Sequence, residues 1–284
     1  MDENKILICG AGTMGTGIAQ LAAESGFGVS LYDQAEPALS AAGQRIAASL
    51  KRAEEKGRIN PRERGLIISR ITYHPSLPPE GAGFCLEAIL EDSDAKTSLF
   101  RHLMGQYGPG PVYLTNTSSL SVSQIAEQLP FPERFAGMHF FNPAPLMPLV
   151  EVVRTDRLGS LELDQVCRLA ARLGKTAVVV RDTPGFIVNR VARPYYLEAF
   201  HLAEEAVADF RDIDRLMEAT GFRMGPFALT DLIGQDINFA VSESIYKAFG
   251  KARRFLPSSL QEQMVRSGKL GKKTGIGFYD YPNG

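Results

Sequence analysis

The stretch GMHFFNPAP, residues 137–145, places His139 between a methionine and two phenylalanines and ends in Asn142 and two prolines. The chain contains only four histidines. The apolar neighbours would suit a core histidine with a satisfied hydrogen bond. The residue type would equally suit proton transfer, because imidazole is the side chain that changes charge near neutral pH. The stretch therefore raises general-base chemistry as one of two interpretations of His139.

A glutamate in the next apolar run is the nearest candidate partner for this histidine. Glu151 lies inside PLVEVV, residues 148–153. A carboxylate buried in such a run needs a partner, because an unpaired buried charge is costly. We therefore predict a His139–Glu151 pair in which the carboxylate fixes the imidazole tautomer and stabilises the imidazolium. The alternative is a core histidine beside a glutamate that contacts the backbone or water.

The remaining histidines are weaker candidates for chemistry. His74 lies in a proline-rich loop, and His102 and His201 lie on predicted helices with polar neighbours. No H-x-x-x-H spacing or cysteine–histidine cluster indicates a metal site, so we expect none.

A glycine-rich turn near the N-terminus indicates a dinucleotide. Gly10, Gly12 and Gly15 form G-x-G-x-x-G between a predicted strand and a predicted helix. The glycines permit a tight turn, close approach of the backbone to a pyrophosphate, and close helix–strand packing. Asp33 ends the second predicted strand, where an acid binds the ribose hydroxyls of NAD, and no arginine follows closely. The pattern favours NAD over NADP, although glycines that merely pack a turn would look similar.

Two domains are expected to position these residues. Apolar β-branched runs predict strands at 4–9, 28–33, 83–88, 111–116, 134–141, 148–153 and 176–180, with helices at 14–25, 36–57, 92–106, 121–128 and 160–173. This alternation is typical of a mostly parallel sheet covered on both faces by helices, an α/β Rossmann-like domain over 1–184. After the break at DTPGF, the pattern predicts an all-α domain over 185–284, with helices at 186–208, 212–220, 226–249 and 257–267.

The composition limits the classes of partner. Lys and Arg total 31 and Asp and Glu total 32, so the net charge of −1 gives no electrostatic reason to expect a nucleic-acid or membrane partner. Three cysteines indicate buried free thiols in a reducing compartment rather than a disulfide framework. The N-terminus lacks a signal-peptide pattern and no apolar run reaches about 18 residues. We therefore expect a cytoplasmic protein.

Seven motifs together resemble the L-3-hydroxyacyl-CoA dehydrogenase family. They are GAGTMGTGIA, EAILED, NTSSLS, GMHFFNPAP, LVEVV, TPGFIVNR and the terminal GKLGKKTGIGFYDY. The resemblance covers essentially the whole chain in order. It implies NAD-dependent interconversion of (S)-3-hydroxyacyl-CoA and 3-oxoacyl-CoA by a Rossmann-like domain and a helical C-terminal domain that forms a homodimer. The chain ends soon after GFYDYPNG, so no fused second enzyme is expected.

The resemblance also implies roles for individual residues. His139 would be the general base and Glu151 its partner, while Ser118 and Asn189 would hydrogen-bond the substrate oxygen. The positions that match the family's NAD contacts are Gly10, Gly12, Thr13, Met14, Gly15, Asp33, Glu91, Lys96, Ser118, Asn142 and Lys273. Ser49 and Lys56 match its coenzyme A contacts.

The acyl-CoA substrate raises two further points. Lys56 lies in a basic helix that could hold the phosphates of coenzyme A or could simply be a solvated face; Glu54 and Glu55 interrupt its basic run. Arg193 follows Asn189 by one helical turn, in segments similar to the branch acting on 3-hydroxyadipyl-CoA. Arg193, or an arginine at 253–254, could bind a distal carboxylate. Alternatively, Arg193 pairs with a structural carboxylate or a dimer contact.

Three functions stay open at this point. The first is the acyl-CoA dehydrogenase, with a 3-hydroxybutyryl or a 3-hydroxyadipyl chain. The second is another β-hydroxyacid dehydrogenase, which often relies on a lysine near the domain junction, where this chain has TPGFIVNR. The third is an inactive NAD-sensing or crystallin-like protein. The intact set of Ser118, His139, Glu151 and Asn189 favours the first.

Overall fold

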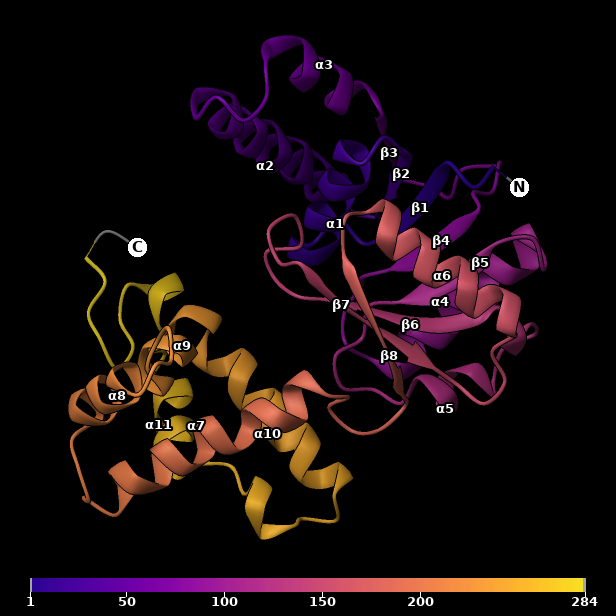
Figure 1. Cartoon of the computed structure of the whole chain (residues 1–284). Helices are drawn as coiled ribbons and strands as arrows, with labels where there is room; N and C mark the ends of the chain where they lie inside the picture. Colours follow the sequence, from indigo (N-terminus) through magenta and orange to yellow (C-terminus); the bar gives the residue numbers. More distant parts are fainter. Residues whose placement is uncertain (1, 283–284) are drawn as a thin grey trace. The chain divides into compact units, whose positions relative to one another are not determined.

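The computed structural model describes residues 2–282 of the chain. It divides into two compact units, Met1–Asp182 and Thr183–Gly284, and each is described here by itself (Figure 1).

The first unit is built on one eight-stranded sheet (Figure 1). Its strands are β1 (Lys5–Cys9), β2 (Gly28–Tyr32), β3 (Ile71–His74), β4 (Phe84–Glu87), β5 (Val112–Thr115), β6 (Phe135–Phe140), β7 (Leu149–Arg154) and β8 (Thr176–Arg181). They lie in the order β3-β2-β1-β4-β5-β6-β7-β8. Every pair is parallel except β6 and β7, which run antiparallel. The predicted Rossmann-like fold class is therefore confirmed.

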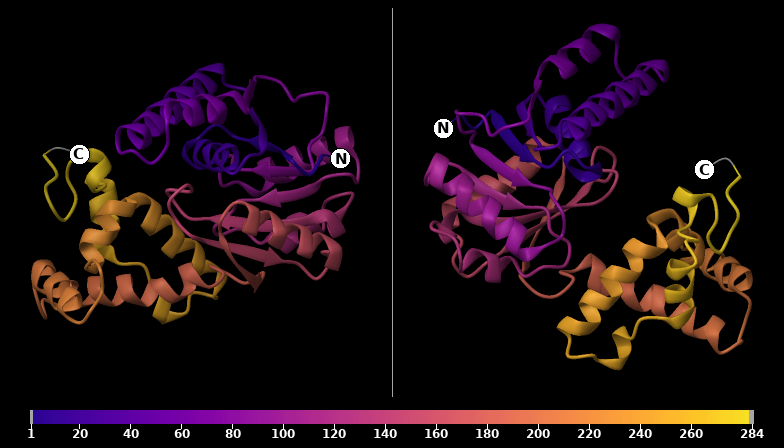
Figure 2. Two further views of the ribbon diagram at one scale, coloured as in Figure 1. Left: turned by 45° about the horizontal axis from the view of Figure 1, so that its top comes forward. Right: turned by 180° about the vertical axis from the view of Figure 1, so that it is seen from behind.

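Helices cover both faces of this sheet (Figure 2). They are α1 (Thr13–Glu24), α2 (Glu36–Glu55), α3 (Pro61–Ser69), α4 (Ser93–Tyr107), α5 (Val122–Ala126), the short 3₁₀ helix η1 (Pro132–Arg134) and α6 (Ser160–Arg172). Apolar residues of α1, α2 and α6 form one core with the sheet. On α4, Phe100 packs edge-on against Tyr113 of β5 and Phe135 of β6.

Strand alternation decides which side chains share a face. Met138 and Phe140 of β6, together with Val150 and Val152 of β7, belong to the core under α1, α2 and α6. The residues between them therefore point to the opposite face, that of Phe100 and α4. By the same alternation His139, Glu151, Thr115 and Glu87 all point to the α4 face, near the carboxyl ends of β4, β5 and β6.

The second unit is helical, as predicted. It contains α7 (Val188–Glu204), α8 (Phe210–Ala219), α9 (Pro226–Ile233), α10 (Gln235–Ala248), α11 (Ser259–Arg266) and the 3₁₀ helices η2 (Arg253–Phe255) and η3 (Lys272–Thr274). Its apolar core gathers around Tyr196, Phe200, Ile213 and Phe227. Pro194 lies inside α7 rather than at its start.

Several sequence predictions need correction. The helix predicted over 226–249 is two helices, because Gly234 adopts φ +105° between α9 and α10. No element was predicted for the residues of α3 and β3, and His74 is the last residue of β3 rather than part of a loop. Cys9 and Cys85 are buried free thiols as expected, but Cys167 on α6 is only partly buried.

Candidate active site

The predicted His139–Glu151 pair is present, and it is a direct cross-strand pair. In the antiparallel β6–β7 ladder the two residues are register partners. His139 Nδ1 lies 2.8 Å from Glu151 Oε2. His139 is 6% exposed and Glu151 is 1% exposed, so water screens the contact little. The Phe141 ring lies 4.6 Å from the imidazole, centroid to centroid, and covers part of it.

Two side chains that the sequence analysis did not select hold the backbone around this pair. Asn116 Oδ1 accepts a hydrogen bond of 2.9 Å from the N–H of Phe140. Lys175 Nζ donates to the carbonyl oxygens of Ala144 and Met147, in the turn between β6 and β7. Burial lowers the pKa of Lys175. Asn142, the predicted NAD contact in this turn, is exposed and is followed by a cis peptide bond.

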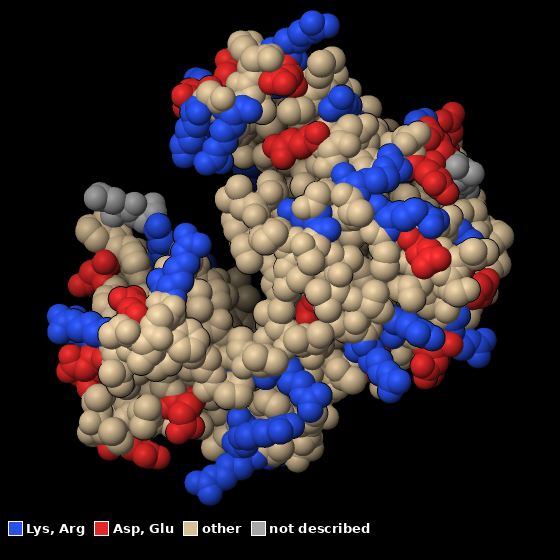
Figure 3. Space-filling model, viewed as in Figure 1, with Lys and Arg blue, Asp and Glu red and all other residues tan. Residues whose placement is uncertain are grey.

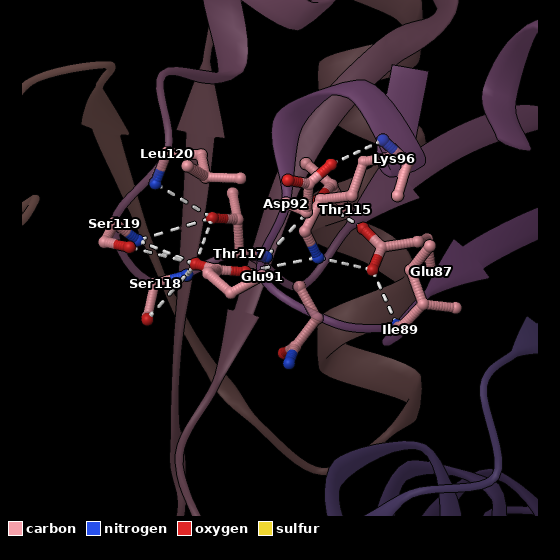
Figure 4. Close-up of polar contacts among 12 residues, drawn as sticks. Glu87, Ile89, Glu91, Asp92, Lys96, Thr115, Thr117, Ser118, Ser119 and Leu120 are labelled. Carbon is pink, nitrogen blue, oxygen red and sulfur yellow. Dashed lines mark hydrogen bonds and ion pairs between the residues drawn. The ribbon is translucent and has the colours of Figure 1, made fainter. Parts of the chain in front are cut away.

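The loop after β5 is organised around the carboxylate of Glu91 (Figure 4). Glu91 Oε1 accepts hydrogen bonds from the backbone N–H groups of Ser118 and Ser119, at 3.0 and 3.2 Å, and from the hydroxyl of Thr117 at 2.6 Å. Two residues expected to contact NAD, Glu91 and Ser118, are thus in direct contact.

A buried lysine links this loop to the sheet. Lys96 is 1% exposed, and its Nζ lies 2.5 Å from Glu87 Oε1 and 3.2 Å from Glu91 Oε2 (Figure 4). Burial raises the pKa of Glu87 despite Lys96 and the other donors. Burial also acts to raise the pKa of Glu91. The charge of Lys96 and the hydrogen bonds from Thr117 and Ser118 outweigh it, so the pKa of Glu91 is lowered. Lys96 therefore sits between two carboxylates, of which the sequence analysis identified only Glu91.

The glycine-rich turn fits a bound pyrophosphate. A Cβ on Gly10 would lie 2.5 Å from the Ala88 oxygen, and one on Gly15 would lie 1.8 Å from the Gly10 oxygen. A Cβ on Gly12 would meet nothing within 4 Å. Packing within the chain therefore requires Gly10 and Gly15, whereas Gly12 borders open space. Gly12 is also the N-cap of α1 and brings no capping side chain, which leaves the positive end of the helix to an anion.

Side chains from two other segments hydrogen-bond to this turn. Asp33 follows β2, and its Oδ2 accepts a hydrogen bond of 2.8 Å from the N–H of Ala11. Arg45, which the sequence analysis did not select, reaches from α2 and donates to the Ala11 oxygen and to the Thr16 hydroxyl, at 2.8 and 3.0 Å. Thr13 and Met14 form the first turn of α1. Asp33, which follows β2, and Arg45 of α2 therefore both hold this turn by hydrogen bonds.

In the second unit, Asn189 lies in the first turn of α7 and Arg193 one turn later. Arg193 is 3% exposed. Its Nη1 donates to the Asn238 oxygen and to the Ser242 hydroxyl of α10, both at 2.9 Å, and its guanidinium lies over the Tyr196 ring. Burial lowers the pKa of Arg193 to about 10. These contacts favour a structural role, with a carbonyl oxygen and a hydroxyl as partners instead of the carboxylate considered above.

Lys273, the remaining predicted NAD contact, is half-exposed in η3. Its Nζ lies 2.5 Å from Asp236 Oδ1, at the start of α10. The segment around Lys273 is held to α9 by Asp231, which is 0% exposed and accepts the N–H groups of Phe278 and Tyr279.

The residues expected to contact coenzyme A lie along α2. Ser49 is half-buried on this helix and Lys56 is its exposed C-cap. Acidic and basic side chains mingle over α2 and α3 (Figure 3). Glu54, which interrupts the basic run, is paired with Arg64 of α3 at 2.8 Å. This pairing offsets part of the acidic charge next to Lys56.

Among residues 2–282, no three His, Cys, Asp or Glu side chains are grouped so that they could hold a metal ion. Within the same residues, none of the helices has the length and apolar character needed to span a membrane.

Comparison with known proteins gives the family context. A family model described as the NAD binding domain of 3-hydroxyacyl-CoA dehydrogenase matches residues 5–183. A second, described as the C-terminal domain of 3-hydroxyacyl-CoA dehydrogenase, matches residues 185–281.

Individual relatives carry two different substrate names. The chain is 45% identical to a 3-hydroxyadipyl-CoA dehydrogenase of Escherichia coli, over 97% of this chain but only 58% of that protein. It is 41% identical to a probable 3-hydroxybutyryl-CoA dehydrogenase of Bacillus subtilis, over 99% of this chain and 98% of that one. A solved (S)-3-hydroxybutyryl-CoA dehydrogenase from Ralstonia eutropha has a TM-score of 0.92 at 35% identity and covers 99% of each chain.

Proposed function

Because the chain belongs to the 3-hydroxyacyl-CoA dehydrogenase family, we propose that it interconverts (S)-3-hydroxyacyl-CoA and 3-oxoacyl-CoA with NAD as cofactor. The observation that carries this proposal is the buried His139–Glu151 pair on the α4 face of an NAD-binding sheet. We assign cofactor binding to residues 1–184, and substrate contacts and dimerisation to 185–284.

In this proposal His139 acts as the general base. With Nδ1–H donated to Glu151, the imidazole would take the proton of the substrate hydroxyl at Nε2. Glu151 would hold that tautomer and stabilise the imidazolium that forms. Ser118 and Asn189 would donate hydrogen bonds to the substrate oxygen as it becomes a carbonyl. When bound, NAD supplies the acceptor for the hydride that leaves the same carbon.

For the cofactor, we assign the pyrophosphate to the turn formed by Gly10, Gly12, Thr13, Met14 and Gly15, and the adenosine ribose to Asp33. Glu91, Lys96, Ser118, Asn142 and Lys273 are the further NAD contacts of the proposal. The open space at Gly12 and the uncapped start of α1 support the first assignment. The contact between Glu91 and Ser118 supports a common role for these two residues.

The preferred acyl chain is proposed to be short, as in 3-hydroxybutyryl-CoA. A 3-hydroxyadipyl chain is the second candidate, because the 45%-identical relative carries that name. Arg193 gives this candidate little support, since its guanidinium is buried against α10. Ser49 and Lys56 are the proposed coenzyme A contacts, and a cytoplasmic homodimer is the proposed state.

A panel of CoA esters tests the proposal. NADH oxidation with acetoacetyl-CoA should be rapid, and kcat/KM for 3-hydroxybutyryl-CoA should be compared with that for 3-hydroxyadipyl-CoA. NADH binding with no turnover of any ester would refute the dehydrogenase and favour an NAD-sensing or crystallin-like protein.

Arg193→Ala serves as the specificity variant in this panel. We expect it to affect both esters similarly and to lower the free energy of unfolding by about 2–4 kcal/mol, as other large truncations in a core do. A loss confined to the dicarboxylic ester would instead show that Arg193 binds a carboxylate.

A further inference from the structure

A buried glutamate outside the set of proposed contacts, Glu87, binds Thr115 and Lys96, and these two residues lead to the Ser118 loop. Glu87 ends β4 and is 0% exposed. Its carboxylate accepts three hydrogen bonds from three different segments: Ile89 N–H at 2.7 Å, Lys96 Nζ at 2.5 Å and the Thr115 hydroxyl at 2.7 Å (Figure 4). Burying a carboxylate without partners is costly, so Glu87 depends on these three donors.

The first connection from Glu87 to the loop passes through Thr115. The Thr115 hydroxyl donates to Glu87 Oε2 and accepts the N–H of Thr117 at 3.3 Å. A hydroxyl has one hydrogen, and the carboxylate takes it because a carboxylate only accepts. A lone pair of Thr115 is thereby directed to Thr117. The negative charge of Glu87 thus makes the Thr115 hydroxyl donate to Glu87 and leaves it to accept from Thr117.

The second connection passes through Lys96. Its ammonium bridges Glu87 and Glu91, and Glu91 accepts the N–H groups of Ser118 and Ser119. If the charge at Glu87 were lost, Lys96 would pair with Glu91 alone and draw that carboxylate away from the loop.

The loop amides depend on these side chains. Thr117 N–H binds Thr115, Ser118 and Ser119 N–H bind Glu91, and Leu120 N–H binds the Thr117 hydroxyl at 3.0 Å. Four consecutive N–H groups are therefore held by side chains rather than by a sheet ladder. The order of this loop therefore depends on side-chain contacts that single substitutions can remove.

We propose that Glu87 is a positioning residue for the reaction, which orders loop 117–120 through Thr115 and Lys96 and so sets the position of Ser118. The reaction step rests on the proposed function, in which Ser118 contacts the substrate oxygen. The ordering of the loop does not, because it concerns this chain without ligands. The two halves can therefore be tested separately.

Glu87→Gln tests the ordering. Glutamine removes the charge that pairs with Lys96 and replaces one acceptor oxygen with an NH2 donor, so it weakens the connection through Lys96 and disrupts the hydrogen bond that Thr115 donates. Hydrogen–deuterium exchange of the ligand-free protein should be about tenfold faster for amides 117–120, which is the scale of one lost hydrogen bond. Exchange in β1 and β6 should stay unchanged. Unchanged exchange in the loop would overturn the proposal.

Glu162→Gln is the matched control. Glu162 forms a partly buried ion pair with Arg134 at 2.6 Å, and Arg134 also binds the Pro111 oxygen at the other end of β5. This variant should lose stability without faster exchange at 117–120. Equal acceleration in both variants would mean that Glu87 supports the fold only, and the proposal would fail.

Thr115→Val isolates one connection and remains informative if Glu87→Gln does not fold. It keeps the shape of the side chain and removes the hydroxyl between Glu87 and Thr117. Exchange should rise by several-fold at Thr117 and less at Ser119. A rise at neither amide would contradict this connection and with it the proposal.

Steady-state kinetics then tests the step that involves Ser118. With saturating NADH, Glu87→Gln should lower kcat about tenfold while the KM for the acyl-CoA changes little, because the affected contact strengthens in the transition state. Faster exchange with normal kcat would overturn the positioning role and would leave the dehydrogenase assignment to the substrate panel.

Discussion

At the scale of single residues, the His139–Glu151 pair makes the sharpest prediction. His139→Ala should lower turnover by roughly 10²–10⁴, the usual contribution of a positioned acid or base. The affinity for NADH, measured by fluorescence titration, should barely change, because other residues form the turn proposed to bind the pyrophosphate. A near-normal rate would remove His139 from the mechanism.

Glu151→Gln is the companion variant for this pair. It should lower turnover less than His139→Ala does, and it should move the acid limb of the pH–rate profile to lower pH. The reason is that a neutral amide stabilises the imidazolium less than a carboxylate does. An unchanged profile would contradict the proposed partnership.

The glycine turn offers a matched pair of variants. Gly12→Ala should leave thermal stability unchanged and weaken NADH binding by at least about tenfold, because its Cβ meets no atom of the chain within 4 Å but fills the proposed pyrophosphate space. Gly15→Ala should destabilise the fold itself, since its Cβ would lie 1.8 Å from the Gly10 oxygen. Equal NADH affinity in Gly12→Ala and the parent protein would refute this placement.

Single residues also show how far sequence reasoning reached. Spacing alone paired His139 with Glu151, because a buried carboxylate needs a partner. The same argument applied to Glu87, inside the apolar run GFCLEA, would have found another buried carboxylate. Its partners Lys96 and Thr115 come from a helix and another strand, so only the fold brings them together.

At the scale of elements, α11 makes a prediction about pH. Glu204, the last residue of α7, accepts the hydroxyls of Ser258 and Ser259 and the N–H of Leu260 at the start of α11. Burial acts to raise the pKa of Glu204, but these hydrogen bonds outweigh it and lower the pKa. Its contribution to stability is therefore present above the ordinary value of 4.5 and lost as pH falls through the lowered pKa.

Glu204→Gln should lower the free energy of unfolding at pH 7 by roughly 0.5–1 kcal/mol, the usual effect of an anion at a helix N-terminus. The variant should also lose less stability than the parent on acidification through this range. Glu205→Gln, at the exposed neighbouring position, is the control and should follow the parent protein. Identical acid denaturation curves for all three proteins would contradict the role of Glu204.

Two of the features that were not predicted have recognisable patterns in the sequence. Asn60 and Glu63 form a capping box at α3, with Pro61 at its first position, and that pattern stands in the sequence as NPRE. The antiparallel β7 was implied by the short turn 141–148, because a parallel connection needs a dozen or more residues. The four-residue edge strand β3 gave no such signal, since it is too short to show alternation.

At the scale of the whole molecule, the division into two units predicts partial independence. A fragment of residues 1–182 contains its own core, the glycine turn, Asp33 and the His139–Glu151 pair. It should fold and bind NADH with an affinity within about tenfold of the full chain, that is about 1.4 kcal/mol. It should not turn over acyl-CoA, because Asn189 lies outside it. A fragment that folds but does not bind NADH would contradict the assignment of cofactor binding to this unit.

Because β6 and β7 pair in antiparallel register, the length of the turn between them decides whether Glu151 lies opposite His139. Side chains alternate along a strand, so a slip of one residue would bring Val150 or Val152 opposite His139 and turn Glu151 to the other face of the sheet. Lys175 holds two carbonyls of the 141–148 turn, which leaves an inserted residue little room to bulge. An insertion of one residue in this turn would move the Glu151 carboxylate away from His139, with the same consequence for the pair as a substitution of Glu151. During divergence, length changes in this turn should accordingly be selected against.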